Sequence, residues 1–79
     1  MENRELTYGE KAVGLTFNPS NNEAVQAIKE AFAVAIDKIQ DERAKDTTPS
    51  EKGAMLTLAI REAQSAQMWA VKAVTWEMQ

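Results

Sequence analysis

The sequence predicts an all-α fold, a hairpin of two long antiparallel helices that follows a short N-terminal arm or helix. Two observations predict this class. Apolar residues recur every three to four positions over residues 21–45, the period of an amphipathic helix, and residues 49–78 are apolar or alanine over most of a helix circumference. A helix-start signal precedes each of these stretches. A chain of 79 residues has room for one small domain, so we expect residues 1–79 to fold together, with residues 1–20 as the arm.

The first long helix is predicted to begin at a capping box. In this motif Ser20 accepts a hydrogen bond from a free backbone N–H, and Glu23 returns a bond from three residues later. Ala33 and Val34 fall outside the apolar stripe of this helix. Because the stripe is narrow, we expect it to pack against one partner. The stripe consists of Val25, Ile28, Phe32, Ala35, Ile36 and Ile39.

The second long helix also has a predicted start, with Thr48 as the cap, Pro49 at the first helical position and Glu51 at the third. Its apolar and alanine positions cover more than half of its circumference, which is more than one antiparallel neighbour buries. We therefore expect self-association into a homo-oligomer. The alternative is a monomer in which Trp69 and Trp76 lie along the seam within one chain.

Composition excludes several classes of function. The chain has no Cys and no His, so disulfides, the common zinc sites and thiol or imidazole catalysis are closed to it. Asp37 and Asp41 are one turn apart, and we expect them to be an exposed, solubilising pair. We expect no enzyme activity, no metal and no cofactor. The formal charge of −3 argues against binding of a nucleic acid polymer, and no apolar run is long enough for a membrane span.

Residues 7–20, which read TYGEKAVGLTFNPS, fit neither a regular element nor a plain linker. They lead into the start of the first long helix, and a helix start attracts anions. Phe17 offers a face for a base, and Lys29 lies close enough to reach a ligand over the helix start. The alternative is that Ser20 only caps, Phe17 only covers the hairpin and Lys29 is solvated. The other loop candidates are Asn18, Pro19 and Ser20, of which Asn18 and Ser20 offer side-chain hydrogen bonds.

Tyr8 and Lys11 form a second aromatic and basic pair on the same segment. The alternative for this pair is a short arm that packs its Tyr on a neighbouring chain. Neither Gly9 nor Gly14 belongs to a phosphate-loop pattern, so the segment predicts no known nucleotide motif by itself.

Two stretches are similar to a known family. GEKAVGLTFNPS with AVQAIKEAF, and later AIREAQSAQMWAVKAVTW, resemble the phage hairpin-domain family that includes anti-CBASS and anti-Thoeris sponge proteins; the match covers residues 7–36 and 59–76. The resemblance implies a protein that acts in the cytoplasm of the infected bacterium and sequesters cyclic dinucleotide messengers such as cGAMP without cleaving them. It also implies a compact oligomer, commonly a hexamer, with ligands between protomers.

The resemblance also implies roles for individual residues. The base-stacking aromatic of the family aligns with Phe17, with Tyr8 as the alternative, and its pocket lysine aligns with Lys29. Some members hold cyclic trinucleotides in separate pockets, for which Lys11 and Lys72 are the candidates for phosphate contacts. Two other functions stay open, a sponge for cyclic ADP-ribose-type Thoeris signals and a purely structural or partner-binding helical oligomer.

Overall fold

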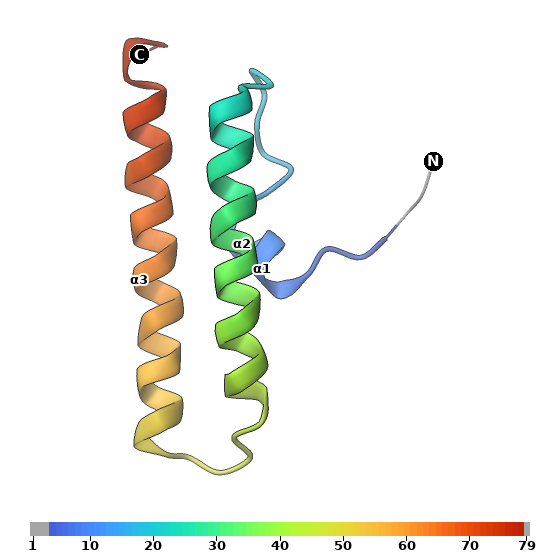
Figure 1. Ribbon diagram of the computed structural model, residues 1–79, viewed down its shortest axis with the longest axis vertical. Helices are drawn as coiled ribbons and strands as arrows, with labels where there is room; N and C mark the ends of the chain where they lie inside the picture. The colour runs from blue at the N-terminus through green and yellow to red at the C-terminus, as the bar shows by residue number, and fades with distance from the viewer. Residues whose placement is uncertain (1–3, 79) are drawn as a thin grey trace.

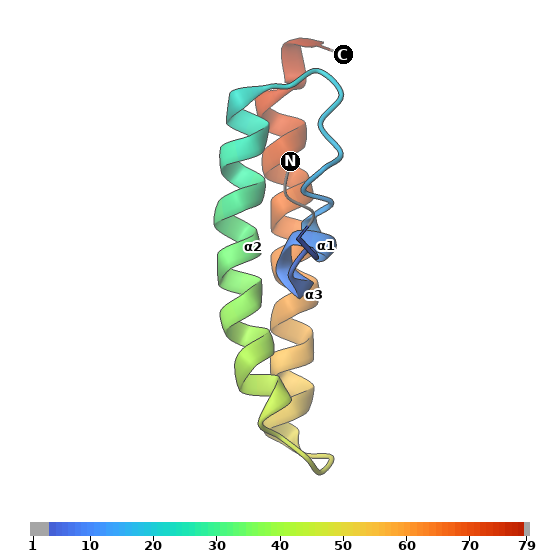
Figure 2. The same ribbon diagram turned by 90° about the vertical axis from the view of Figure 1, so that its right-hand side faces the viewer.

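The computed structural model describes residues 4–78 and is a helical hairpin with one added short helix, which confirms the predicted all-α class (Figure 1). Two long helices, α2 (Glu23–Ala44) and α3 (Glu51–Val74), run side by side. The short helix α1 (Tyr8–Val13) lies against α2 about halfway along its length (Figure 2). A 3₁₀ turn, Trp76–Met78, follows α3. None of these helices combines the length and apolar character that a bilayer crossing requires within the described part of the chain.

The expectation that residues 7–20 hold no regular element is wrong, because α1 forms there. Thr7 is its N-cap and completes a capping box with Glu10: the Glu10 N–H donates to the Thr7 hydroxyl at 3.1 Å, and the Thr7 N–H donates to the Glu10 carboxylate at 2.9 Å. Gly14 ends the helix in the left-handed region, at φ 64°. The helix therefore has a start signal and a stop signal of its own.

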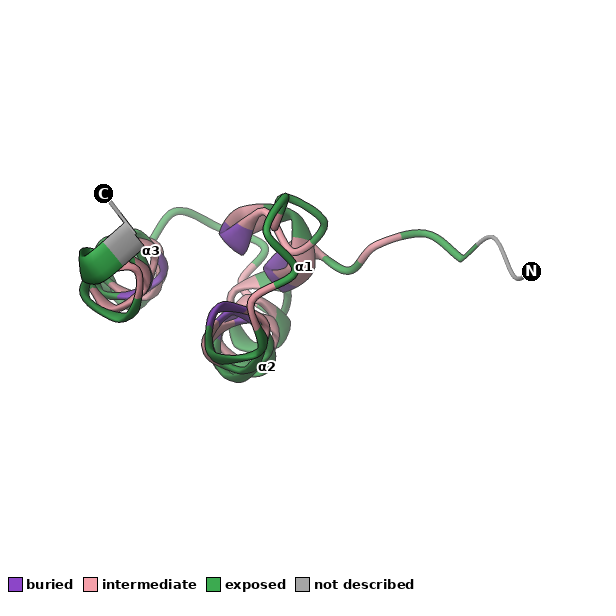
Figure 3. Cartoon of the chain, turned by 90° about the horizontal axis from the view of Figure 1, so that it is seen from above, coloured by how far each residue is buried: buried purple, intermediate pink, exposed green. Residues whose placement is uncertain are grey.

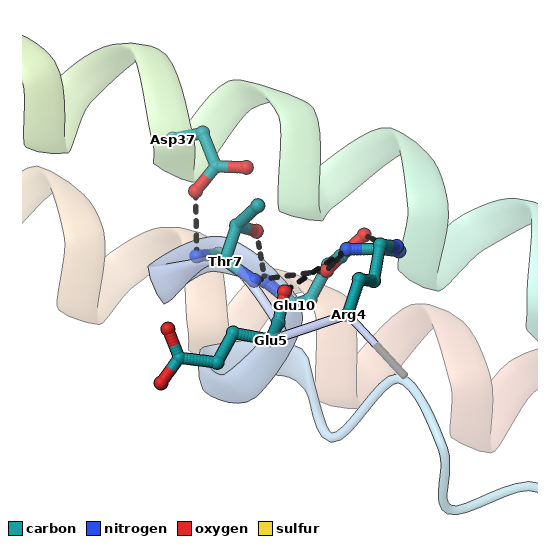
Figure 4. Close-up of polar contacts among 6 residues, drawn as sticks. Arg4, Glu5, Thr7, Glu10 and Asp37 are labelled. Carbon is teal, nitrogen blue, oxygen red and sulfur yellow. Dashed lines mark hydrogen bonds and ion pairs between the residues drawn. The ribbon is translucent and has the colours of Figure 1, made fainter. Parts of the chain in front are cut away.

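The first turn of α1 is joined to α2 by an unusually close backbone contact. A Cβ on Gly9 would overlap the carbonyl oxygen of Ala33, so only glycine allows this approach. The Gly9 N–H, one of the free donors of a helix N-terminus, donates to the Asp37 carboxylate at 2.7 Å (Figure 4). The sequence interpretations of Ala33 as lying outside the packed stripe and of Asp37 as merely solubilising are therefore wrong, since Ala33 is buried and Asp37 anchors α1.

An ion pair holds the same turn from the side of the arm. Arg4 donates two hydrogen bonds of 2.7 Å to the Glu10 carboxylate (Figure 4). These bonds, together with the one from the Thr7 N–H, lower the pKa of Glu10 from 4.5 to about 2. Folding therefore stabilises the ionised Glu10 carboxylate. Its contribution to the free energy of unfolding is fully present above pH 4.5 and is lost as the pH falls towards 2.

The core lies where the three helices meet, and their buried positions face one another in the view along the helices (Figure 3). Among the residues whose burial is described, only Ile36 and Ile60 are large side chains with almost no exposure. Around them pack Val13 from α1 and the partly buried Phe32 and Ile39 from α2. A core this small leaves much of α3 uncovered.

Both long helices begin two residues later than the sequence patterns predict. Asn22, not Ser20, caps α2 by accepting from the N–H groups of Ala24 and Val25. Ser50, not Thr48, caps α3 by accepting from the Gly53 N–H at 2.9 Å. The predicted arm of residues 1–20 therefore extends to residue 22 as structure that precedes α2, and the predicted helix at 49–78 ends as α3 at Val74 followed by the 3₁₀ turn. Residues 1–3 and 79 lie outside the described residues.

One side of α3 carries large apolar side chains that no other described element covers. Leu58, Trp69 and Trp76 are between 60% and 68% exposed. Leu58 and Trp69 are eleven residues apart, which places them on one side of α3, opposite the buried Ile60, and Trp76 follows in the 3₁₀ turn beyond the helix. We call this side the outer face of α3. The alternative that both tryptophans fill the seam within one chain is wrong.

Replacement of Gly9 by Ala should destabilise the protein, because the new methyl group must push α1 off the Ala33 carbonyl and lengthen the bond to Asp37. Overpacking of this kind typically costs about 1–3 kcal/mol. Urea unfolding followed by circular dichroism measures the change. Gly53→Ala is the matched control, since a Cβ there meets only side-chain atoms, at 3.1 Å and beyond, and alanine favours the helix. Equal effects of the two substitutions would contradict the close-contact explanation.

Candidate functional site

An open cleft lies where α1, the loop after it, α2 and α3 come together. Its volume is about 600 Å³, within the range typical of small-molecule sites. Four helical and loop segments supply its walls, so the cleft exists only when α1 is docked. The lining residues are Lys11, Ala12, Val13, Gly14, Phe17, Lys29, Gln64, Gln67, Met68 and Val71.

Lys29 is buried at the bottom of this region and holds the loop in place. Its residue is 6% exposed, and its ammonium donates to the carbonyl oxygens of Gly14 at 2.9 Å and Phe17 at 2.6 Å. Burial lowers the pKa of this ammonium below its usual value. An ammonium has three N–H donors, so one remains that no described residue accepts. The interpretation of Lys29 as a solvated surface lysine is wrong.

Phe17 lines the cleft and is 74% exposed as a residue. The Lys29 ammonium lies 5.6 Å from the ring centroid, close enough for a cation–π contact. The Phe17 N–H donates to the Gly14 carbonyl at 2.9 Å, so the backbone that carries the ring is fixed by two bonds of its own. A flat ring that is both exposed and held in place is suited to stacking on a flat ligand.

The other loop candidates lie beside the cleft and not in its walls. Asn18 and Asn22 bond reciprocally: the Asn18 amide donates to the Asn22 carbonyl at 3.0 Å, and the Asn22 N–H donates to the Asn18 side-chain oxygen at 3.2 Å. Pro19 and Ser20 are exposed in the turn between them. These contacts shape the loop and the start of α2.

Tyr8 and Lys11 lie together at a small hollow, but only Lys11 lines the larger cleft. Lys11 is exposed and lines the cleft. Tyr8 packs against the core of its own chain, and its hydroxyl accepts from Arg43 at 3.1 Å, which lowers the pKa of the phenol. The two residues share a smaller hollow of about 240 Å³ between α1 and α3, with Arg61. Lys72, in the last turn of α3, is exposed and lines neither space.

Sequence reasoning missed the wall that α3 provides. Gln64 donates to the Ala12 carbonyl at 3.1 Å and so joins α3 to the end of α1. Gln67 is 5% exposed and Met68 is 62% exposed, and both line the cleft. Gln67 follows the buried Ile60 by seven positions, so it lies on the inward side of α3. A polar residue within an apolar seam was the signal available in the sequence.

The cleft offers binding groups and no poised acid and base. An exposed ring, apolar walls and two lysine ammonium groups suit a flat ligand that carries negative charge. The residues described at 4–78 contain no group of three acidic side chains placed to hold a metal ion. A second cleft of about 420 Å³ at the turn between α2 and α3 has no aromatic wall.

The comparison with known families agrees with this geometry. The model of the Acb2/Tad1 hairpin domain matches residues 10–75, which is most of the chain. No curated protein and no solved structure matches this chain. The family is known for sponge proteins that bind signalling molecules of the CBASS and Thoeris defences. The resemblance found in the sequence is confirmed, and the chain belongs to the Acb2/Tad1 hairpin-domain family.

Proposed function

We propose that this protein sequesters cyclic dinucleotide messengers of the cGAMP type in the cytoplasm of the infected bacterium. It holds the messenger without cleaving it, so the effector of the CBASS defence is not activated. Membership of a sponge family supports this class of function. The choice of a cyclic dinucleotide rests on the chemistry of the cleft.

The observation that carries the proposal is the convergence of Phe17, Lys29 and Lys11 on one cleft. A cyclic dinucleotide has two flat bases and two negative phosphates. The Phe17 ring stacks on one base, a contact worth about 1–3 kcal/mol where it occurs. The free N–H of Lys29 and the exposed ammonium of Lys11 face the phosphates. Asn18, Pro19 and Ser20 act indirectly, through the shape of the loop.

A sponge works in proportion to its amount, so its affinity must be high, and a cleft open on one side encloses a ligand poorly. We propose that a second copy of the chain closes it. Met68 lines the cleft and is itself exposed. The next residue, Trp69, lies on the outer face of α3. Association through this apolar face buries Leu58 and both tryptophans and brings protomers together at the cleft. The assembly proposed is a homo-oligomer of six chains, as the family resemblance implies.

The tests below would also detect other ligands of the same chemistry. A cyclic ADP-ribose-type signal also has a purine and phosphates, and the open rim of the cleft does not exclude it. A cyclic trinucleotide would need a separate pocket between protomers, for which Lys11 and Lys72 remain the proposed phosphate contacts. A purely structural helical oligomer would bind neither.

Phe17→Ala should weaken the binding of a cyclic dinucleotide about 5- to 150-fold, which corresponds to the loss of one stacked base. The substitution should leave the free protein as stable as before, because the Phe17 ring is exposed. Isothermal titration calorimetry measures the affinity, and the melting temperature of the free protein checks the fold.

Thr16→Ala is the matched control for this substitution, since Thr16 is an exposed neighbour in the same loop and lies outside the cleft. Ligand released by denaturing the complex should be intact when identified by mass spectrometry. Unchanged affinity in Phe17→Ala would show that the ligand does not bind on this ring. Release of a cleaved product would show an enzyme and not a sponge.

Trp69→Glu should dissociate the assembly, because it places a charge in the middle of the proposed apolar interface. Sedimentation velocity should show wild-type particles several times larger than the 8.8 kDa chain and a variant close to that mass. Thr47→Glu adds the same charge at the exposed hairpin turn and should not change the mass of the assembly. A wild-type protein that sediments as a folded 8.8 kDa particle would refute the oligomer.

A further inference from the structure

Gln67 is a buried polar side chain without an evident structural role. Its residue is 5% exposed, and its amide makes no hydrogen bond with any residue of the described range 4–78. Among those residues, no fully enclosed polar side-chain atom lacks a partner. The Gln67 amide therefore keeps some accessible surface, and since the residue lines the cleft, that surface faces the cleft.

The position itself favours an apolar residue. Gln67 lies on the inward side of α3, one heptad beyond the fully buried Ile60, where a methionine or leucine would pack without loss of hydration. A buried amide that bonds to nothing in the free protein weakens the fold. An amide in this place is explained if a ligand in the cleft supplies its partners.

The neighbouring Gln64 differs in this respect. Its amide N–H₂ donates to the Ala12 carbonyl at 3.1 Å, and its side-chain oxygen accepts from Arg61 at 2.9 Å. Gln64 thus joins α1 to α3. Of the two cleft glutamines, only Gln67 has both its donor and its acceptor available to a ligand.

We propose that Gln67 recognises an adenine base in the cleft, so that the preferred messengers carry adenine at this site. This inference rests on the proposed function. A glutamine amide presents a donor and an acceptor side by side, which matches the N7 acceptor and N6 amino donor of adenine. Guanine presents two acceptors, N7 and O6, on the same edge and leaves the amide oxygen of Gln67 unpaired. Phe17, in the same cleft, stacks on the face of the base while Gln67 reads its edge.

The test compares a cyclic dinucleotide of two adenines with its counterpart of two guanines by isothermal titration calorimetry. The wild-type protein should bind the adenine compound about 10- to 100-fold more tightly, as expected for one bidentate base contact. Gln67→Met, which keeps the size and shape of the side chain, should bring the two affinities within about threefold of each other. The melting temperature of the free variant should equal or exceed that of the wild type, because it loses an unpaired amide.

Gln64→Met is the matched control. It should lower stability by removing the bond to Ala12, so the readout is the ratio of the affinities for the two compounds, which should match that of the wild type. Equal affinity of the wild-type protein for both compounds, or a preference for adenine that persists in Gln67→Met, would overturn this inference alone. Failure of the wild type to bind either compound would overturn the proposed function with it.

Discussion

The close approach of α1 to α2 at Gly9 is the constraint on which the rest of the structure depends. Because Gly9 has no side chain, the backbone of α1 reaches the Ala33 carbonyl, and Asp37 takes up the N–H that the helix start would otherwise leave unpaired. This contact fixes the position of α1 on α2, and so the position of the loop that follows α1. Lys29 then collects two carbonyl oxygens of that loop, which orients Phe17. The cleft therefore depends on the absence of a side chain at Gly9.

The net negative charge of the protein is compatible with an anionic ligand, because two of its positive groups lie at the same cleft. The chain carries a formal charge of −3, yet Lys11 and Lys29 lie at one cleft and neither forms an ion pair with a described residue. Burial makes the Lys29 ammonium costly, and the loop carbonyls offset part of that cost. The same lysine therefore stabilises the loop and retains one donor for the cleft. Stability of the loop and capacity to bind are properties of one side chain.

The hairpin was predictable because the periodic apolar positions of α2 and α3 extend over many turns. The helix α1 was predicted only as the alternative to an arm, since six residues are too few to form a helix without tertiary contacts, although Thr7, Glu10 and Gly14 gave its start and stop signals. The helix starts were misplaced because Ser20 and Asn22, like Thr48 and Ser50, are all good caps, and only folding selects between them. Phe17 and Lys29 were predicted as neighbours, and the structure brings them to one cleft. The α3 wall depends on how α3 packs against α1 and α2, and its one local signal was Gln67, a polar residue within an apolar seam.

Hydrogen–deuterium exchange with and without a cyclic dinucleotide tests the central claim most directly, because it locates the ligand without any substitution. A ligand in the cleft should slow exchange in two segments that are far apart in sequence, residues 11–17 and 64–71, and leave the hairpin turn at 45–50 unchanged. Protection at the turn alone, or no protection at a concentration that saturates binding, would contradict the account.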